Sequence, residues 1–152
     1  MSFQLKNYKK LEDWKKSKKT IVFTNGCFDL LHKGHIDLLT LASKYGDKLI
    51  VGINSDESVK KLKGEDRPVE NQRTRKKNLL NIKYVDDVYV FEESTPLNVI
   101  KSICPDVLVK GADYTVPEIV GAKFVLSNGG KVRTVPLTPG FSTTKSIEKM
   151  AK

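Results

Sequence analysis

Five short apolar runs recur along the chain, and segments with helical spacing of their apolar residues separate them. The runs lie at residues 21–23, 48–54, 85–91, 106–109 and 131–135. Short runs rich in β-branched residues are typical of buried parallel strands. Strands that alternate with helices form a parallel sheet, and right-handed crossovers place the helices on both of its faces. The pattern therefore predicts an α/β fold, a doubly wound five-stranded parallel sheet with helices on both faces.

Residues 1–19 are predicted to form an amphipathic helix that packs on a single domain of residues 20–152. Its apolar residues repeat every three positions among lysines and make one narrow stripe: Leu5, Tyr8, Leu11 and Trp14. A basic helix can also bind nucleic acid or a membrane surface, but this one interleaves few aromatic residues with its lysines. We therefore expect the stripe to pack on the side of the domain or on a partner subunit.

The other helices are predicted from their spacing and from their end signals. The helix that follows the first strand is expected to end through a glycine C-cap at Gly46. Pro96 is expected at the first position of a later helix, where its missing N–H does no harm. Further helices are predicted at residues 56–62, 70–82 and 117–127, and a last one from Ser142.

The stretch from Thr20 to His35 joins the first strand to the helix after it. The strand ends at Asn25-Gly26, where glycine can adopt positive φ and turn the chain sharply. Backbone N–H groups and the helix dipole then face the turn, which makes it an anion site. Two histidines, His32 and His35, lie where the helix begins, and Gly34 between them leaves room for a phosphate.

The length and the net charge of the chain limit the functions that it can have. A chain of 152 residues is the usual size of one domain, and its net charge of +9 favours anionic partners such as nucleic acid, nucleotides or sugar phosphates. Two cysteines in a chain of this length do not indicate a disulfide framework. The sequence shows no apolar signal region and no apolar run near the about 20 residues that span a membrane. We expect a soluble, cytoplasmic protein.

The residues from Gly26 to His35 resemble the G-x-F-D-x-x-H-x-G-H signature of the cytidylyltransferase-like nucleotidyltransferases. The resemblance implies a Rossmann-like fold and an enzyme that transfers a nucleotidyl group. His32 and His35 would be catalytic and stabilise the transition state at the α-phosphorus. The nucleotide would contact the turn itself, and Asp29 would bind the substrate. The turn residues concerned are Asn25, Gly26, Cys27, Phe28 and Gly34.

A second stretch, Gly140-Phe141-Ser142-Thr143-Thr144-Lys145, lies after the last strand. Hydroxyl residues at the start of a helix commonly cap its N–H groups, and they can also bind phosphate oxygens. The run resembles the second signature of the same family, with Phe141 where isoleucine is usual. By that resemblance Ser142, Thr143 and Thr144 would bind the β and γ phosphates of the nucleotide.

Two loops supply the remaining candidates. The lysines after the second strand can form a solvated face or can neutralise phosphate charge. The resemblance implies one catalytic lysine among them, for which we choose Lys63, and assigns Lys61, Arg67 and Arg73 to the substrate. The turn after the fourth strand adds candidate nucleotide ligands on the other side: Lys110, Gly111 and Asp113.

Matches beyond the signatures resemble the adenylyltransferase domain of ADP-heptose synthases. They include Leu62-Lys63-Gly64, Arg67-Pro68-Val69 and the segment from Pro105 to Gly111. The resemblance implies transfer of AMP from ATP to D-glycero-β-D-manno-heptose 1-phosphate, with Mg²⁺ carried by ATP and a homodimer as the assembly. Because the sugar kinase that often accompanies this domain is absent from the sequence, we expect a stand-alone adenylyltransferase. We expect it to bind neither nucleic acid nor membranes.

Two alternatives remain. The first is a cytidylyltransferase acting on glycerol 3-phosphate or a similar alcohol phosphate. It is disfavoured because Leu137-Thr138-Pro139-Gly140 lacks the arginine that precedes the second signature in those enzymes. The second is a basic nucleic-acid-binding domain without catalysis, which would bind oligonucleotides with a strong salt dependence.

Overall fold

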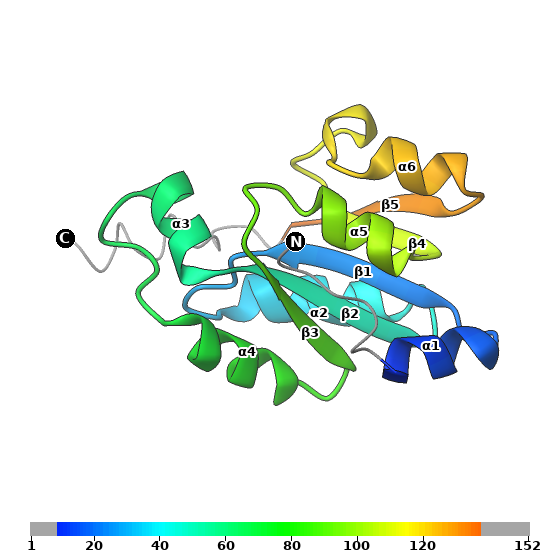
Figure 1. Cartoon of the computed structure of the whole chain (residues 1–152), viewed down its shortest axis with the longest axis horizontal. Helices are drawn as coiled ribbons and strands as arrows, with labels where there is room; N and C mark the ends of the chain where they lie inside the picture. Colours follow the sequence, from blue (N-terminus) through cyan, green and yellow to red (C-terminus); the bar gives the residue numbers. More distant parts are fainter. Residues whose placement is uncertain (1–8, 138–152) are drawn as a thin grey trace.

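A parallel sheet forms the centre of the protein, as the computed structural model describes it for residues 9–137 (Figure 1). The strands lie in the order β3-β2-β1-β4-β5, and every neighbouring pair is parallel. The predicted α/β fold with a doubly wound five-stranded sheet is confirmed. The strands are β1 (Ile21–Gly26), β2 (Lys48–Asn54), β3 (Asp87–Phe91), β4 (Val107–Gly111) and β5 (Lys131–Val135).

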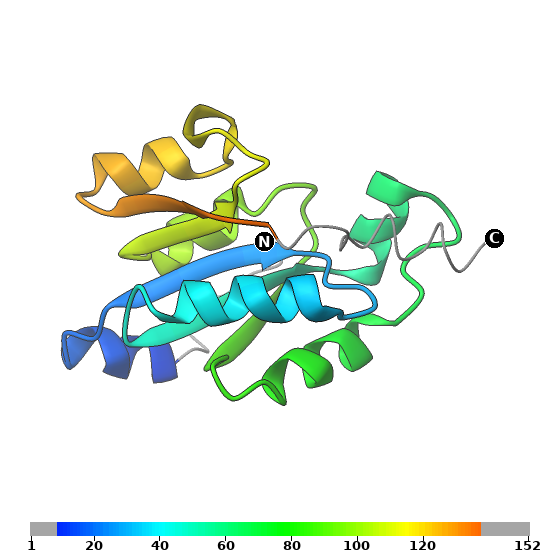
Figure 2. The same ribbon diagram turned by 180° about the vertical axis from the view of Figure 1, so that it is seen from behind.

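Helices cover both faces of the sheet, which Figures 1 and 2 show from opposite sides. One face packs against α1, α5 and α6, and the other packs against α2 and α4. Helix α3 lies beyond the carboxyl ends of the strands (Figure 1). The helices are α1 (Lys9–Lys16), α2 (Lys33–Ser43), α3 (Asp56–Lys63), α4 (Gln72–Leu80), α5 (Leu97–Ile103) and α6 (Ala122–Ser127), with a 3-10 turn η2 (Val116–Glu118).

The alternation of side chains along each strand divides the core into two layers. Ile21 and Phe23 of β1 pack in the layer that contains Ile100 of α5, whereas Val22 packs in the layer that contains Leu39 of α2. All five side chains are fully buried. Because successive strand residues point to opposite faces, a run that is apolar throughout needs cover on both sides. This is why the short apolar runs form the middle of a three-layer fold.

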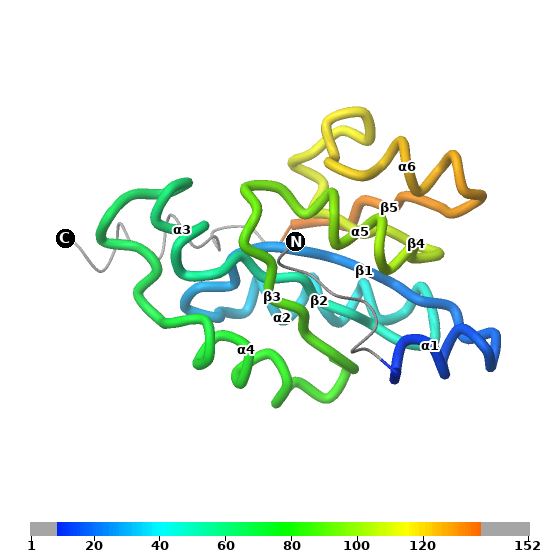
Figure 3. The backbone as a smooth tube through the Cα atoms, viewed as in Figure 1, coloured from blue at the N-terminus to red at the C-terminus, as the bar shows by residue number. Residues whose placement is uncertain are grey.

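The chain reverses its direction of travel across the sheet at β1. The tube in Figure 3 shows β1 between β2, which follows it directly, and β4, which comes much later in the sequence. In open parallel sheets, ligands bind at the carboxyl ends of the strands where the strand order reverses. The loops that follow β1, β2 and β4 therefore define where a ligand site is expected.

The end of α2 differs from the prediction. The helix ends at Ser43, and its C-cap is Lys44 in a right-handed conformation. The prediction of a glycine C-cap at Gly46 is wrong. A Cβ at Gly46 would lie 2.8 Å from the carbonyl oxygen of Thr20 and 2.7 Å from Val22. Glycine is needed here because the α2–β2 connection passes against the start of β1.

Three other helix boundaries also move. The region predicted as one helix over 117–127 contains the turn η2 and the short helix α6, separated at Gly121 with φ of +89°. Pro96 is the N-cap of α5 rather than its first residue. The helix predicted to start at Glu70 starts at Gln72, because the Asn71 side chain accepts a hydrogen bond from the Thr74 N–H at 2.8 Å and caps it.

The N-terminal helix is present in its described part, and Leu11 is buried against the sheet. The division into residues 1–19 and 20–152 stays a prediction. Residues 1–8 and the helix predicted from Ser142 lie outside the described residues. Between residues 9 and 137, no helix combines the length and the apolar character that a membrane span requires.

Candidate active site

The turn after β1 is held in an unusual backbone conformation. Phe28 and Leu30 have φ of +49° and +59°, in the left-handed region that residues other than glycine rarely adopt. The predicted positive φ at Gly26 is not observed. Gly26 is small for another reason, since a Cβ there would lie 3.0 Å from the ring of Phe28. Such conformations persist only where the surroundings enforce them, and they concentrate at functional sites.

A buried carboxylate pins this turn to the loop that follows α3. Asp29 is fully buried, and its two oxygens accept hydrogen bonds from the backbone N–H groups of Val69 at 2.7 Å and Glu70 at 2.9 Å. The Glu70 carboxylate in turn accepts a hydrogen bond from the Leu30 N–H at 3.0 Å. Asp29 was predicted to bind the substrate. With its carboxylate enclosed in this way, it positions the turn.

A buried arginine adds further contacts to those of Asp29 and Glu70. Together we call these three side chains the clamp of the turn after β1. Arg75 of α4 is 0% exposed, and its guanidinium donates to four oxygens from three parts of the chain. The acceptors are the carbonyls of Cys27 at 2.9 Å, Asn54 at 2.8 Å and Glu70 at 3.0 Å, and the Asp56 carboxylate at 2.9 Å. Arg75 thus joins the turn after β1, the end of β2 with the start of α3, and the loop before α4.

The two histidines stack on each other at the start of α2. Their ring centroids are 3.9 Å apart with an interplanar angle of 16°. Nδ1 of His32 accepts from the Gly34 N–H at 3.1 Å, and Nδ1 of His35 accepts from the His32 N–H at 3.3 Å, which caps the helix. Because Nδ1 is an acceptor in both rings, the neutral form of each carries its proton on Nε2. In its neutral form each ring therefore carries an Nε2–H donor of the kind that binds phosphate oxygens, and Nε2 of His32 is inaccessible to solvent.

Burial keeps His35 neutral near pH 7. It lowers the pKa of His35 from 6.5 to about 4, with further lowering from the positive charges of His32 and Lys63 and a smaller opposing effect of Asp29. The ring of Phe28 covers His35 with a centroid distance of 5.2 Å. Lys63, whose positive charge contributes to this lowering, is the last residue of α3. Lys63 is the lysine that the sequence analysis chose as catalytic from those that follow the second strand.

The turn after β4 lies on the other side of β1. Lys110 donates from Nζ to the carbonyl of Asn25 at 3.0 Å, and the same ammonium lies 4.9 Å from the ring centroid of Tyr114. Burial lowers the pKa of Lys110, which Asp113 partly opposes. Gly111 is buried, and a Cβ there would meet Leu137 at 2.6 Å and Asp113 at 2.9 Å. The turns after β1 and β4, which are both predicted to bind the nucleotide, are therefore joined by a direct hydrogen bond.

The other predicted site residues differ in their exposure and in their contacts. Lys61 and Arg73 are exposed, and the structure gives neither of them a contact with the turn. Arg67 is buried beside Asp29, with 3.6 Å between its Nε and Oδ2 of the carboxylate. Ser142, Thr143 and Thr144 lie outside the described residues, so their phosphate contacts stay a prediction. Among residues 9–137, no three His, Cys, Asp or Glu side chains converge as a metal site would require.

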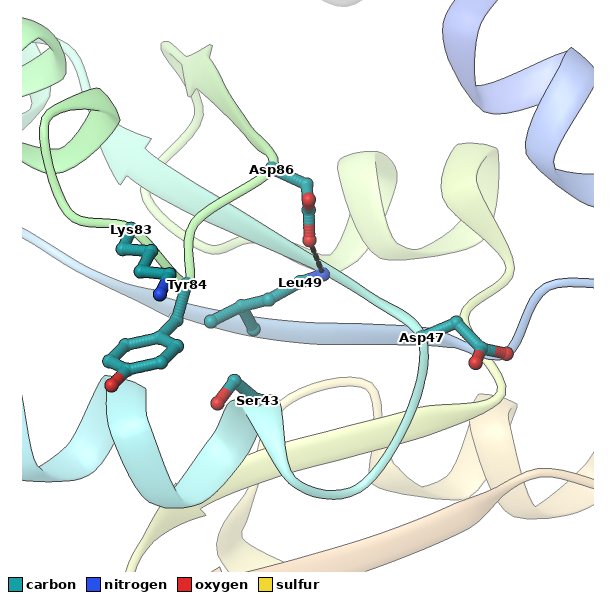
Figure 4. Close-up of a pocket in the computed structure, with 6 residues that line it drawn as sticks. All are labelled: Ser43, Asp47, Leu49, Lys83, Tyr84 and Asp86. Carbon is teal, nitrogen blue, oxygen red and sulfur yellow. Dashed lines mark hydrogen bonds between the residues drawn. The ribbon is translucent and has the colours of Figure 1, made fainter.

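A pocket of about 220 Å³ lies at the opposite end of the sheet (Figure 4). Leu49, near the start of β2, pairs with Val22, so the pocket opens at the amino ends of the strands. Asp86, one of its lining residues, accepts a hydrogen bond from the Leu49 N–H at 2.7 Å. The pocket is therefore separate from the histidine turn. Its lining residues are Ser43, Asp47, Leu49, Lys83, Tyr84 and Asp86.

Residues 23–149 match the model of the cytidylyltransferase-like family. The chain belongs to the cytidylyltransferase-like family. The match runs through the histidine turn, the α3 loop and the β4 turn, and it confirms the predicted family.

Relatives within the cytidylyltransferase-like family carry the comparison further. The bifunctional protein HldE of Koribacter versatilis (strain Ellin345) is 54% identical over 136 residues, which are 90% of this chain and 28% of that protein. The bifunctional protein HldE of Campylobacter fetus subsp. fetus (strain 82-40) is 53% identical over 135 residues, 89% of this chain and 29% of that protein. The chain thus spans less than a third of these relatives.

A solved structure shows the same architecture. The lipopolysaccharide core biosynthesis protein from Thermoplasma volcanium GSS1 superposes with a TM-score of 0.63 at 26% sequence identity, covering 79% of this chain and 97% of that one. The fold of this cytidylyltransferase-like chain is therefore shared along almost the whole length of that protein.

Sequence reasoning missed Arg75 and selected Arg73 instead. The signal was available in the helical spacing, since Arg75 lies four residues before the buried Leu79 and seven before Ile82. That spacing places Arg75 on the inner face of α4, whereas Arg73 projects to solvent. Glu70 was missed as well, and no local pattern marks it, because its partner Leu30 lies 40 residues away.

The stability of the protein should fall as the pH falls from about 6.5 to about 4. Between these values the unfolded chain protonates His35 and the folded chain does not, so protons favour unfolding. A shift of this size is worth on the order of 3 kcal/mol in the free energy of unfolding. Urea denaturation at several pH values should show a smaller fall in the His35→Gln variant. An equal fall in both proteins would contradict the assignment.

Replacing Arg75 by lysine should destabilise the fold by about 3 kcal/mol, because an ammonium cannot reach four fixed oxygens and leaves several buried acceptors unpaired. The matched control is Arg73→Lys on the exposed face of the same helix, expected within about 0.5 kcal/mol of the parent. Urea denaturation measures both. Equal free energies for the two variants would show that the clamp is not needed for stability.

Proposed function

We propose that the chain transfers AMP from ATP to D-glycero-β-D-manno-heptose 1-phosphate and releases pyrophosphate and ADP-heptose. The observation that carries the proposal is the stacked histidine pair at the start of α2, with His35 kept neutral by burial and Nδ1 of both rings engaged as an acceptor. A phosphate oxygen of the sugar attacks the α-phosphorus of ATP. The bond from that phosphorus to the bridging oxygen breaks, and pyrophosphate leaves with the electron pair.

The histidines suit the charge that develops in this step. Negative charge builds on the equatorial oxygens of the α-phosphorus, and hydrogen-bond donors held in place beforehand stabilise it. The N-terminus of α2 adds the positive end of its dipole. No general base is required, because a phosphomonoester is already ionised near neutral pH. A low pKa at His35 is compatible with this role, since the neutral ring donates through Nε2.

We assign the remaining predicted residues to the same reaction. Lys63 acts on His35 through space and is our choice for the lysine that neutralises the triphosphate. Lys110 and Asp113 would receive the nucleoside on the β4 side. Ser142, Thr143 and Thr144 would hold the β and γ phosphates. The nucleotide substrate is MgATP, in which the phosphates and water hold most of the cation.

The choice of heptose and of adenine follows the relatives and the resemblance in sequence. About half of the aligned residues are identical to the HldE proteins, and the T. volcanium protein is described as acting in lipopolysaccharide core biosynthesis. A nucleotide-activated sugar is the product that such a role uses. The proposal includes a cytoplasmic location, where ATP is available, and a homodimer.

The first test is pyrophosphate release with each of the four nucleoside triphosphates, against heptose 1-phosphate and glycerol 3-phosphate as acceptors. We expect release only with ATP and heptose 1-phosphate. Preference for CTP would overturn the adenylyl assignment and leave the chemistry of the turn in place. Absence of release, together with salt-dependent binding of an oligonucleotide, would favour the nucleic-acid-binding alternative.

The second test is the role of His35. Replacing it by alanine should lower the rate by roughly a hundredfold or more, because one donor to the transition state is lost. Thr40→Ala, in the same helix and outside the turn, serves as the control and should stay within about threefold of the parent rate. Melting temperatures of both variants separate loss of catalysis from loss of fold. A His35→Ala enzyme with the parent rate would remove His35 from the mechanism.

A further inference from the structure

Tyr114 is an exposed aromatic side chain at the carboxyl ends of the strands, in the turn that follows β4. The residue is 43% exposed. The exposed tyrosines Tyr45 and Tyr84 lie in the connections that lead into β2 and β3, at the amino ends of the strands. Within residues 9–137, Tyr114 is therefore the only exposed aromatic side chain at the edge of the sheet that carries the histidine turn.

Backbone hydrogen bonds fix the position of Tyr114. Its N–H donates to the carbonyl of Gly111 at 3.1 Å, the spacing of a β-turn. The N–H of Ala112 donates to the carbonyl of Val135 at 2.8 Å and joins the same turn to β5. Because neither bond uses the Tyr114 side chain, replacing that side chain should leave the turn in place.

The ring of Tyr114 has a buried cation on one face. The ammonium of Lys110 lies over the ring, 4.9 Å from its centroid, and also donates to the carbonyl of Asn25 at 3.0 Å. A cation is attracted to the face of an aromatic ring, so this contact holds the ring in one orientation. The opposite face of Tyr114 is then the one that a planar ligand group can contact.

The clamp of the turn after β1 decides on which side of β1 a base can lie. The base and the α-phosphate of a nucleotide are separated by one ribose, so a phosphate at the histidine turn places the base near a neighbouring strand. On the β2 side, the fully buried guanidinium of Arg75 binds the carbonyls of Cys27 and Asn54 and fills the space between the strand ends. On the β4 side, the neighbouring strand end carries Tyr114.

We propose that Tyr114 stacks on the base of the nucleoside triphosphate, with the Lys110 ammonium behind the ring. Every base has a π-face, so stacking on an aromatic side chain strengthens binding of the nucleoside without selecting one base. The choice between adenine and cytosine is then left to contacts with the edge of the base. The inference rests on the proposed function only in requiring that the bound triphosphate carries a base.

Calorimetric titration with two probes tests the assignment. The probes, each with Mg²⁺, are the non-hydrolysable analogue α,β-methylene-ATP and inorganic tripolyphosphate, which has no base. Tyr114→Ala should weaken binding of the ATP analogue by roughly tenfold or more, the loss expected for one base–aromatic contact. It should change binding of tripolyphosphate by less than about threefold, because the phosphates do not touch the ring. Tyr114→Phe keeps the ring and should bind both probes as the parent does.

The matched control is Tyr45→Ala, which makes the same change at a tyrosine that is 40% exposed at the amino ends of the strands. It should bind both probes as the parent does. Equal weakening of both probes by Tyr114→Ala would overturn the proposal, since it would show a disturbed turn or a contact to the phosphates. Parent affinity for the ATP analogue in Tyr114→Ala would overturn it too. So would a loss in Tyr114→Phe as large as in Tyr114→Ala, because the hydroxyl would then be the contact.

A measurement on the unmodified chain covers the case in which the variants do not fold. The ring-proton signals of Tyr114 in an NMR spectrum should shift on addition of α,β-methylene-ATP and stay in place with tripolyphosphate. Unshifted ring signals at saturating ATP analogue would overturn the stacking.

Failure of this assignment differs from failure of the proposed function. If pyrophosphate is released only from CTP, the proposed function fails, and the stacking stands when Tyr114→Ala weakens α,β-methylene-CTP and spares tripolyphosphate. If ATP and heptose 1-phosphate release pyrophosphate while Tyr114→Ala binds the ATP analogue as the parent does, the function stands and the stacking fails.

Discussion

The buried guanidinium of Arg75 is the contact on which the rest of the site depends. It binds the carbonyl of Cys27 in the turn after β1, the carbonyl of Asn54 at the end of β2, and the Asp56 carboxylate at the start of α3. Parallel strands leave their carboxyl ends as separate loops with no ladder between them. One planar cation with several donors can join such loops, since each donor has a fixed direction. The relative positions of turn, helix and loop follow from this contact.

The strain in the turn and the state of the histidines are consequences of that clamp. Left-handed φ at Phe28 and Leu30 is unfavourable, and it is maintained because Asp29 between them is bonded to the loop through two backbone N–H groups. The same turn delivers His32 as the N-cap of α2 and buries His35 under Phe28. The stacking of the two rings and the low pKa of His35 are therefore properties of the fold itself.

Much of the fold and the centre of the site could be predicted because they depend on local patterns. Periods of two and of 3.6 residues give strands and helices whatever lies around them, and the signature from Gly26 to His35 places both histidines at a helix start. The predictions that failed concern conformation and contact. Gly26 was expected to turn the chain through positive φ, but Phe28 and Leu30 do so, because contacts with residues about 40 positions away outweigh their intrinsic preference.

The strands and the order of the elements follow from residue type and spacing alone. Only the tertiary structure decided which polar side chains work inside the protein and which face solvent. It turned Asp29 inward as a support, left Arg73 exposed and buried Arg75 and Arg67. The physical reason is that burial of a charge is set by partners brought together from distant loops, and a linear pattern does not contain their distances.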